Sequence, residues 1–392
     1  MASAEPVVIV GAARTPLGSF QGRLKSVPAP QLGATAIKAA LDRANMPLDA
    51  PDEVFMGCVL PAGVGQAPAR QASLGAGLSL SIGCTTVNKV CGSGMKAAML
   101  GHDLIKAGSA RVVIAGGMES MSNAPYLLAK ARGGYRMGHG QIYDHMFLDG
   151  LEDAYDRGAL MGKFAEDTAE KFQFTRATQD EFAIASLERA KEASANETFT
   201  REIAPVTIDG ETVTGDEAPT RADATKIPKL KPAFREGGTV TAANSSSISD
   251  GAAALVLMDS KEAERRRAKP LARIIGHATH AQEPKWFTIA PVGAIEKLLN
   301  QVGWTKDDVD LYEINEAFAV VTMVAMRELG LPHEKVNVYG GACALGHPIG
   351  ASGARIMVTL LNALETKGLK RGIASLCIGG GEATAIALER VA

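Results

Sequence analysis

The segment Asn88-Lys89-Val90-Cys91-Gly92-Ser93-Gly94 has a counterpart late in the chain, Gly350-Ala351-Ser352-Gly353, and this pair decides the fold. In both places a glycine-rich segment opens a helix, which leads to a short apolar strand and then to a glycine turn. The turn ends in glutamate each time, at Glu119 and at Glu382. Internal repetition of this kind predicts two related halves with the same architecture.

Short apolar runs alternate with helical periodicity through both halves. The expected strands are residues 7–10, ended by Gly11, 54–60, 111–115, 272–275 and 310–314. One expected helix has Val292, Ile295, Leu299 and Val302 on its apolar face and is closed by Gly303. A second helix is expected over 316–329. Alternation of strands and helices predicts an α/β fold with covered sheets.

The chain divides into three parts. Residues 1–118 plus 246–269 are expected to form the first half, and residues 270–392 the second half. Residues 119–245 lack the strand and helix alternation of the two halves. They contain polar and glycine-rich stretches and a capping-box spacing, Thr178 to Glu181, before a helix. That helix carries Ala183, Leu187 and Ala190 on one face. We interpret 119–245 as an inserted lobe, and such lobes commonly cover or build a binding site.

Composition excludes several classes of protein. The chain has 392 residues, with 41 Lys and Arg against 43 Asp and Glu, so its net charge of −2 gives no reason to expect nucleic acid as a partner. No apolar run reaches 18 residues, which argues against a membrane span. The five cysteines form no CxxC pair, which argues against a disulfide framework and a structural zinc site. A reducing, cytoplasmic compartment is expected, and the N-terminus lacks a signal pattern.

Cys91 is a candidate nucleophile. It lies at a strand-to-helix junction, where free N–H groups and the helix dipole favour a thiolate. The alternative is a small buried residue in a tight turn.

Two further residues lie in comparable settings. His347, held between Gly346 and Pro348 before a helix, suits a general base or an oxyanion donor, although a lone histidine is often structural. The other six histidines have no such setting. Cys377 precedes Gly379-Gly380-Gly381, so it is either a second reactive cysteine or a core residue, and the glycines offer backbone N–H groups to an oxyanion.

Asn315 and Glu316 follow an expected strand and open an expected helix. The carboxyl end of a strand is where α/β folds build sites, but asparagine is also a good N-cap residue. No GxGxxG fingerprint is present in the triple-glycine turn, so a nicotinamide site has weak support.

Taken together, five segments in this order resemble the thiolase family from end to end, with the biosynthetic acetyl-CoA C-acetyltransferases most similar. The segments are 88–94, 116–122, 315–319, 346–353 and 377–381. The resemblance implies a five-layer αβαβα fold from two duplicated halves with an inserted loop domain. It also implies ping-pong condensation of two acetyl-CoA to acetoacetyl-CoA. Coenzyme A and acyl-CoA would be substrates, with no metal and no tightly bound cofactor.

The resemblance assigns roles to five residues. Cys91 would take the acyl group, and His347 would activate it and then help bind a thioester oxygen. Cys377 would remove the α-proton of the second acetyl-CoA. Asn315 would hold a water in the oxyanion hole shared with His347, and the N–H groups of Cys91 and Gly379 would form a second oxyanion hole.

The resemblance also implies contacts with coenzyme A. Arg221 matches the position that meets the adenine nucleotide, and Ser246 the one beside the pantetheine arm. Met161 and Phe318 match apolar positions near the thioester. Residues 222–230 are fewer than in the biosynthetic enzymes, and Leu160 stands where those enzymes carry His.

Two further features concern packing and assembly. Cys343 replaces an aliphatic residue of its motif, which we interpret as a packing variant. Residues 126–149 resemble the loop that pairs dimers into tetramers, so a homotetramer is expected, with a surface loop on a dimer as the alternative.

Three rival functions remain. A degradative 3-ketoacyl-CoA thiolase would act on longer chains, and the pocket around Met161 and Leu160 would decide between the two. A ketoacyl synthase that decarboxylates a malonyl donor shares the fold but uses His or Asn where this chain has Cys377. A thiolase-like carrier that binds acyl-CoA without turnover should lack a catalytic residue, and none is missing here.

Overall fold

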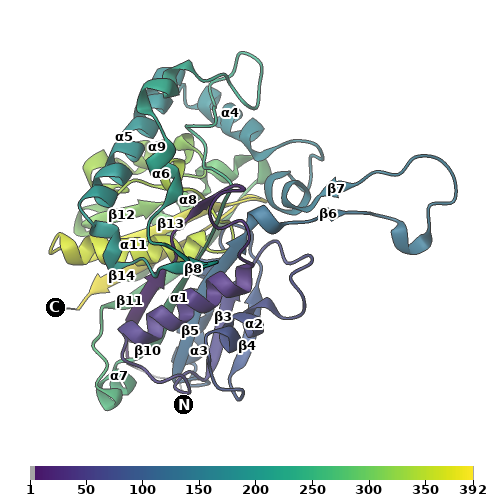
Figure 1. Ribbon diagram of the computed structural model, residues 1–392. Helices are drawn as coiled ribbons and strands as arrows, with labels where there is room; N and C mark the ends of the chain where they lie inside the picture. Colours follow the sequence, from purple (N-terminus) through teal and green to yellow (C-terminus); the bar gives the residue numbers. More distant parts are fainter. Residues whose placement is uncertain (1–4, 392) are drawn as a thin grey trace.

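The computed structural model describes residues 5–391 of the chain (Figure 1). In the first half, the strands lie in the order β1-β10-β5-β3-β4. Their bounds are β1 Val7–Arg14, β3 Glu53–Gly57, β4 Gly83–Val87, β5 Val112–Ser120 and β10 Ser249–Asp259, with the short β2 Gly18–Ser19 paired to β10. The helices of this half are α1 Ala29–Arg43, α2 Pro68–Gly75, α3 Ser93–Lys106 and α7 Ser260–Arg266.

The second half repeats this plan with the strand order β11-β14-β13-β12. The strands are β11 Ala272–Ala281, β12 Leu311–Ile314, β13 Arg371–Ile378 and β14 Glu382–Arg390, and the helices are α8 Ala290–Val302, α9 Ala319–Leu329, α10 Ala342–Leu345 and α11 Ser352–Thr366. Strand β1 pairs with both β10 and β11, so the two halves share one continuous path of strands.

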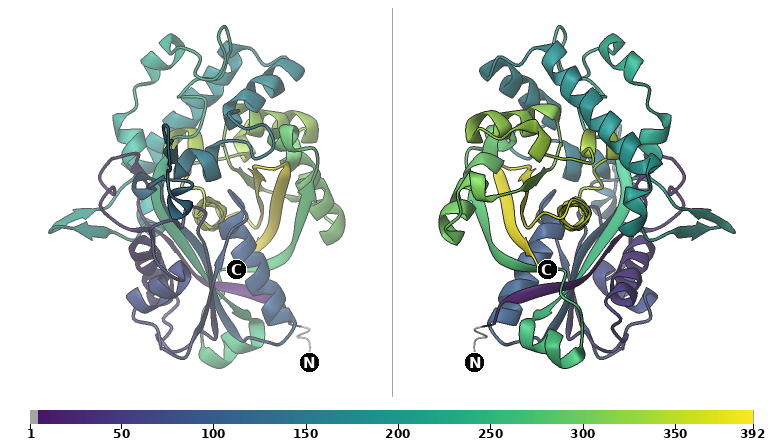
Figure 2. Two further views of the ribbon diagram at one scale, coloured as in Figure 1. Left: turned by 90° about the vertical axis from the view of Figure 1, so that its right-hand side faces the viewer. Right: turned by 90° about the vertical axis from the view of Figure 1, so that its left-hand side faces the viewer.

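Three hydrophobic cores separate five layers. One core joins α1 and α2 to the outer face of the first sheet, and another joins α8 and α9 to the outer face of the second. Between them, α3 and α11 pack against each other and against both sheets, and Figure 2 shows these two helices in the middle of the molecule. The five-layer α/β fold expected from the resemblance is confirmed.

The two inner helices approach each other at the glycines of the repeated segment. A Cβ atom on Gly353 would lie 2.4 Å from the backbone nitrogen of Met95, and one on Gly94 would lie 2.8 Å from that of Ala354. Any larger residue would therefore push the helix N-termini apart. Gly94 and Gly353, which belong to the repeated motif, therefore allow the N-termini of the two inner helices to lie close together.

The segment between β5 and β10, called the lobe below, puts its helices over one end of the halves, at the top of Figure 1, and its hairpin beside α1. It contains α4 Met161–Lys171, α5 Arg176–Ala195, α6 Glu217–Arg221, a hairpin of β8 Val206–Ile208 and β9 Glu211–Val213, and a π-helical turn Phe147–Leu151. Strands β6 Tyr126–Leu127 and β7 Tyr143–Asp144 form the base of an arm that extends away from the body (Figure 1). Single-turn 3-10 segments lie at 121–123, 131–133, 198–201, 224–229, 284–289, 306–308 and 333–335.

Buried ion pairs of Arg14 join the lobe to the first half. The guanidinium of Arg14, fully buried, donates to Asp216 through two bonds of 2.7 and 2.8 Å and to Glu202 at 2.5 Å. Removing one partner of such a group would leave an unpaired buried charge, so this contact fixes the position of the lobe.

Several expected boundaries were wrong. Strand β1 does not end at Gly11 but continues through a bulge to Arg14, because the neighbouring β10 offers backbone partners along its whole length. Strand β5 runs on to Ser120 and β11 to Ala281 for the same reason. Helix α9 begins at Ala319 rather than at residue 316.

The helix of the lobe also begins earlier than expected. Its N-cap is Thr175, whose hydroxyl accepts the N–H of Thr178, so the Thr178 to Glu181 spacing lies inside α5. The predicted apolar face is confirmed, since Ala183, Leu187 and Ala190 are buried. Helix α8 ends as expected at Gly303, which has a left-handed φ of 70°. Within residues 5–391, every helix is too short or too polar to cross a membrane.

Candidate active site

Four loop ends meet where the two halves face the lobe. They are the N-terminus of α3, the segment before α11, the turn between β13 and β14, and the connection from β12 to α9. The turns touch directly, because a Cβ on Gly92 would lie 2.4 Å from the Ile378 side chain. The five residues to which the resemblance gave chemistry lie on these four loops.

Cys91 lies just before α3, in a tightly held turn. Val90 has a left-handed φ of 46°, and Ser93 Oγ accepts from the N–H of Lys89 at 2.8 Å while donating to Val90 O at 2.6 Å. The backbone N–H groups of Gly379 and of Cys91 itself lie close enough to the Cys91 sulfur to lower the pKa of its thiol. N–H groups from both halves therefore lie near this atom.

Burial nevertheless raises the pKa of Cys91 to about 11, against the two N–H donors, which lower it. The expectation that the helix N-terminus favours a thiolate was wrong for the resting enzyme, because loss of hydration outweighs the dipole. Cys91 is a thiol at neutral pH, and a base must remove its proton before it can attack.

His347, to which the resemblance assigned the role of base, has a ring that is held in one orientation. Ser352 Oγ lies 2.6 Å from His347 Nδ1 and donates its own hydrogen to Pro348 O at 3.0 Å, so Nδ1 is the protonated nitrogen of the ring. Nε2 is buried and has no hydrogen-bond partner. Burial, helped by the charge of Arg355, lowers the pKa of His347 to about 3. The ring is neutral and presents an unoccupied lone pair.

Cys377 lies at the end of β13, completely buried. Burial raises the pKa of its thiol far above the ordinary value, and the charge of Cys91 acts in the same direction, which places the two sulfurs in one electrostatic neighbourhood. Gly379 follows in the turn, 3.6 Å from the Met161 methyl group as measured from a Cβ built on the glycine. Cys377 is therefore both a core residue and a neighbour of Cys91.

Asn315 is buried, and both atoms of its carboxamide lack a protein partner. Its backbone is held by the 3.0 Å bond from its N–H to Ser375 O. Helix α9 has Phe318 at its N-cap, so the capping interpretation of Asn315 is excluded. An unsatisfied buried amide is costly unless a water or a ligand meets it, which fits a site for one.

Met161 and Phe318 pack in the apolar cluster that contains Cys377. Phe318 packs edge-on against Phe234 and Phe287, and this cluster includes Cys377 and the partly buried Met161. Leu160, partly buried, precedes Met161 as the N-cap of α4. The surroundings of Cys377 are thus apolar.

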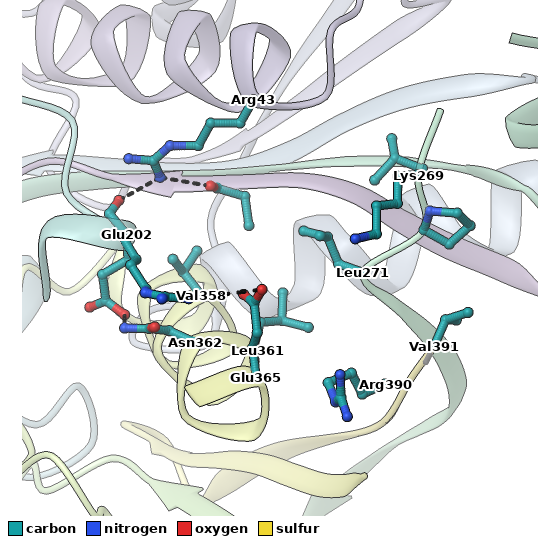
Figure 3. Close-up of a pocket in the computed structure, with 14 residues that line it drawn as sticks. Arg43, Glu202, Lys269, Leu271, Val358, Leu361, Asn362, Glu365, Arg390 and Val391 are labelled. Atoms are coloured by element: carbon teal, nitrogen blue, oxygen red, sulfur yellow. Dashed lines mark hydrogen bonds and ion pairs between the residues drawn. The ribbon is translucent and has the colours of Figure 1, made fainter. Parts of the chain in front are cut away.

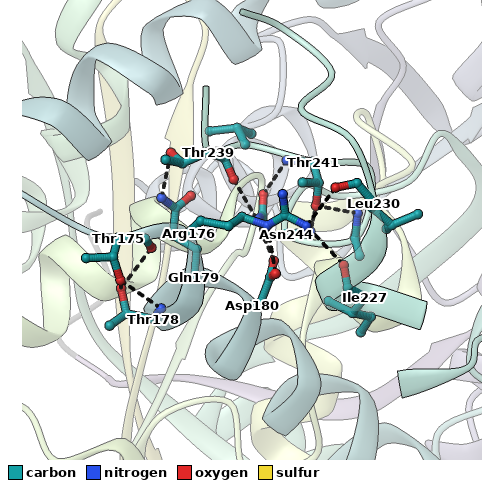
Figure 4. A network of polar contacts seen from close by, with 12 residues as sticks. Thr175, Arg176, Thr178, Gln179, Asp180, Ile227, Leu230, Thr239, Thr241 and Asn244 are labelled. Atoms are coloured by element: carbon teal, nitrogen blue, oxygen red, sulfur yellow. Dashed lines mark hydrogen bonds and ion pairs between the residues drawn. The ribbon is translucent and has the colours of Figure 1, made fainter. Parts of the chain in front are cut away.

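Ser246 lies in a segment that touches two of the catalytic loops. Its N–H donates to Ala317 O at 2.9 Å, and the next residue, Ser247, accepts the N–H of His347 at 3.0 Å. Figure 4 shows what holds this segment: Asn244 donates to Asp180 and to Thr239 O, each at 3.1 Å. The lobe thereby sets the position of the strand that passes the site.

Arg221 lies at the end of α6, exposed and paired with Glu217 at 2.7 Å. It lines a groove of about 300 Å³ together with Lys226, Ser247 and Cys343. The groove therefore leads from two cations on the lobe to the segment that carries His347. Ser246 itself is not among the groove residues. Cys343, partly buried, contacts Glu316 O through its sulfur at 3.7 Å.

Three residues hold the site without having been given a role from the sequence: Glu119 and Ser352, which were missed, and Glu316, which was noted only as the neighbour of Asn315. Glu119 is completely buried and accepts the N–H groups of Val59, Leu60 and Gly350 at 2.9–3.1 Å, which ties the first half to the segment after His347. Burial raises its pKa to about 7. Ser352 fixes the His347 tautomer. Both residues stand in the repeated motifs, where only the glycines and cysteines were given roles.

Glu316 is the third of these residues. It accepts from Ser186 at 2.7 Å, Asn337 at 2.8 Å and the N–H of Cys343 at 3.1 Å. It therefore joins the lobe helix α5 to the loop that carries His347. Its position next to Asn315 was the available signal.

A separate cavity of about 220 Å³ contains none of the predicted residues (Figure 3). There Arg43 donates to Ala12 O at 2.9 Å and to Glu202 O at 2.8 Å. The guanidinium is occupied by backbone carbonyls and joins α1 to the lobe, so its role is structural.

Comparison with known proteins identifies the family. The model for the thiolase N-terminal domain matches residues 7–261, and that for the thiolase C-terminal domain matches residues 268–390. Acetyl-CoA acetyltransferase 2 of Arabidopsis thaliana is 53% identical over 98% of this chain and 96% of its own length, and Acetyl-CoA acetyltransferase of Schizosaccharomyces pombe is 50% identical over 98% and 99%.

Two solved structures agree. The Acat5 thiolase from Ascaris suum in complex with coenzyme A has a TM-score of 0.94 at 43% identity, covering 99% of this chain and 100% of that one. The acetyl-CoA acetyltransferase of Bacillus anthracis has a TM-score of 0.96 at 40% identity, with both chains covered completely. The two matched domains and the four loops that meet at Cys91 lead to one conclusion: this chain belongs to the thiolase family.

Proposed function

We propose that this protein is an acetyl-CoA C-acetyltransferase that reversibly condenses two acetyl-CoA to acetoacetyl-CoA and coenzyme A through an acyl-Cys91 intermediate. The observation that carries the proposal is the pair of buried, protonated cysteines, Cys91 and Cys377, which act on each other and lie beside the N–H of Gly379. The neutral His347, whose buried Nε2 has no partner, supports it. The names of the similar proteins described above support the choice of substrate.

In the first half-reaction, His347 Nε2 takes the proton of Cys91, and the thiolate attacks the carbonyl carbon of acetyl-CoA. The N–H groups of Cys91 and Gly379 lie at the sulfur and are placed to receive the thioester oxygen of the acyl-enzyme. The carbon–sulfur bond to coenzyme A breaks. The leaving coenzyme A thiolate needs a proton, and the protonated thiol of Cys377 donates it. The step leaves His347 charged and Cys377 as a thiolate.

These two charges prepare the second half-reaction. The thiolate of Cys377 removes an α-proton from the second acetyl-CoA. The enolate oxygen is met by the protonated His347 and by a water on the Asn315 carboxamide, which has free donor and acceptor atoms. The carbanion attacks acyl-Cys91, the new carbon–carbon bond forms, and Cys91 leaves as a thiolate that recovers its proton from His347. Cys377 keeps the α-proton, and the resting state is restored.

Coenzyme A is proposed to bind along the groove from Arg221 to Ser247. Two cations, Arg221 and Lys226, offer charge to phosphates, and Ser246 lies next to the groove residue Ser247 and donates to Ala317 O. The Ascaris suum neighbour was solved with coenzyme A, which supports this placement. The acetyl end would then lie among Met161, Phe318 and Cys377.

We also propose a domain division, an oligomeric state and a compartment for the protein. Residues 1–118 plus 246–269 and residues 270–392 are the two halves, and 119–245 is the loop domain that carries the coenzyme A contacts. We further propose a homotetramer assembled through the arm at residues 126–144. The exposed apolar side chains of this arm include Tyr126, 65% exposed, and Met137, 98% exposed, and such surface commonly marks an interface. All five cysteines are free, which fits a reducing, cytoplasmic setting.

The length of the accepted acyl chain tests the proposed substrate. We expect thiolysis of 3-ketoacyl-CoA by free coenzyme A to be fastest with the four-carbon substrate and to fall steeply as the chain grows. The reason is that Phe318 and Met161 pack around Cys377 and leave little room. The measurement is the initial rate across substrates of increasing length. Equal or rising rates with long chains would make the enzyme a degradative thiolase, and no consumption of any 3-ketoacyl-CoA would make it a carrier.

A second expected result concerns the tautomer of His347. Ser352→Ala removes the acceptor of the Nδ1 proton, so the ring is free to place its proton on Nε2 and lose its function as base. We expect kcat for acylation to fall about 10²-fold, within the usual contribution of a positioned base, while KM changes little. The control is Ser73→Ala, a buried serine on α2, far along the sheet. Unchanged acylation in Ser352→Ala would contradict the assigned tautomer.

A further inference from the structure

Three side chains with metal-binding atoms converge on the side of the molecule where α3 passes β11. His102 and Asp103 are neighbours on α3, and His277 lies on β11, 175 residues away from His102. Neither histidine stood out in the sequence, because the cluster exists only after the two halves pack. It contains none of the residues assigned to catalysis or to coenzyme A.

The three ligand atoms lie at mutual distances suited to one ion. His277 Nε2 is 3.2 Å from His102 Nδ1 and 2.9 Å from Asp103 Oδ1, and His102 Nδ1 is 3.0 Å from the same oxygen. Tetrahedral zinc with bonds of about 2.0–2.1 Å holds its ligand atoms about 3.3 Å apart. An ion would fit after the side chains move outward by a few tenths of an ångström.

Hydrogen bonding does not explain all three contacts. Each ring nitrogen carries at most one hydrogen, so two hydrogens are the most that this triangle of atoms holds. At least one of the three short contacts therefore joins two electron-rich atoms without a hydrogen between them. A cation at the centre satisfies every one of the three atoms at once.

The charges and burial around the cluster are suited to a metal. The three ligand atoms lie within 4.8 Å of one another. The side chains of His102 and His277 are only 15% and 16% exposed, whereas Asp103 is 55% exposed and leaves a path from solvent. The nearest cation, Lys106, lines the same crevice of about 440 Å³ but donates to Glu5 O at 2.9 Å.

We propose that His102, Asp103 and His277 bind one late divalent transition metal ion, Zn²⁺ first among them, with water completing the coordination. Two imidazoles and one carboxylate are ligands that zinc prefers, while Mg²⁺ prefers oxygen ligands alone. The ion links α3, the helix that follows Cys91, to β11, the first strand of the second half. It is a structural link between the halves and takes no part in acyl transfer.

The test is equilibrium dialysis of the metal-free enzyme against buffered Zn²⁺, with Asp103→Asn and His277→Gln as variants. The matched control is His280→Gln, a histidine on the same strand that contacts Gln282 instead. We expect the wild type and the control to bind one more ion than the two variants. The affinity should fall more than about 100-fold, since even loss of an outer-shell partner costs 10–100-fold.

Two further readouts separate this site from the cysteines and from misfolding. Co²⁺ bound here has nitrogen and oxygen ligands, so its spectrum should lack the thiolate charge-transfer band that Cys91 would produce. Zn²⁺ should raise the Tm of the wild type and of the control but not of Asp103→Asn, whose exposed side chain is not needed for folding. Equal zinc binding by all four proteins, or cobalt that shows only the thiolate band, would overturn the proposal.

Discussion

Cys91→Ala is expected to abolish formation of the acyl-enzyme and to lower kcat by about 10⁶-fold, the scale seen when a covalent nucleophile is removed. Alanine keeps the backbone N–H that points at the sulfur but supplies no atom for the acyl group to bond with. The measurement is incorporation of radiolabelled acetyl groups from acetyl-CoA into acid-precipitated protein, together with the rate of acetoacetyl-CoA thiolysis.

The matched control for this variant is Cys84→Ala. Cys84 lies on the edge strand β4, is also free and partly buried, and has no place in the mechanism. It should be labelled like the wild type. Full labelling of Cys91→Ala would remove Cys91 from the role of nucleophile and direct attention to Cys377.

Cys377→Ala is expected to separate the two half-reactions. Condensation should fall by about 10⁴-fold, the upper end of what a positioned acid or base contributes, because no thiolate remains to take the α-proton. Acylation should continue, about 10-fold slower, since the leaving coenzyme A must draw its proton from solvent. Labelling with acetyl-CoA reports acylation, and exchange of the acetyl methyl protons with deuterated water reports proton removal.

Retained acylation in Cys377→Ala also shows that the variant folds, so the result does not depend on a separate test of structure. Methyl-proton exchange at the wild-type rate would show that another group is the base. Loss of both half-reactions with an intact fold would contradict the division of labour between the two cysteines.

Much of this site was visible in the sequence because it is built from local motifs. Cys91, His347 and Cys377 each stand beside or close to glycines, which mark tight turns and close approaches of the backbone. The repeat likewise predicted two similar halves, because each copy carries its own strand, turn and helix. Strand ends were harder, since β1 and β5 extend as far as β10 pairs with them, and that length is set by the partner.

What the sequence left open depends on groups that meet only in three dimensions. The helix N-terminus at Cys91 suggested a thiolate, but the pKa is set by burial between two sheets and a lobe, which no local pattern reveals. Glu119 and Gly350 are 231 residues apart, and their contact is a consequence of the packing of the two halves. The cluster of His102, Asp103 and His277 also forms only when α3 packs against β11, so no local pattern in the sequence reveals it.

The place of β10 in the sheet has a consequence for biosynthesis. It pairs with β1 on one side and β5 on the other, with Val7 opposite Asp259. A ribosome must therefore release almost 260 residues, the whole lobe included, before β10 can be inserted between β1 and β5. Until then, the edges of β1 and β5 that face β10 are unpaired and their apolar faces are exposed. Chains in this state are prone to aggregate. Folding of such a long-range sheet is slow, so the new chain exposes these edges for longer than a chain whose paired strands follow each other in sequence.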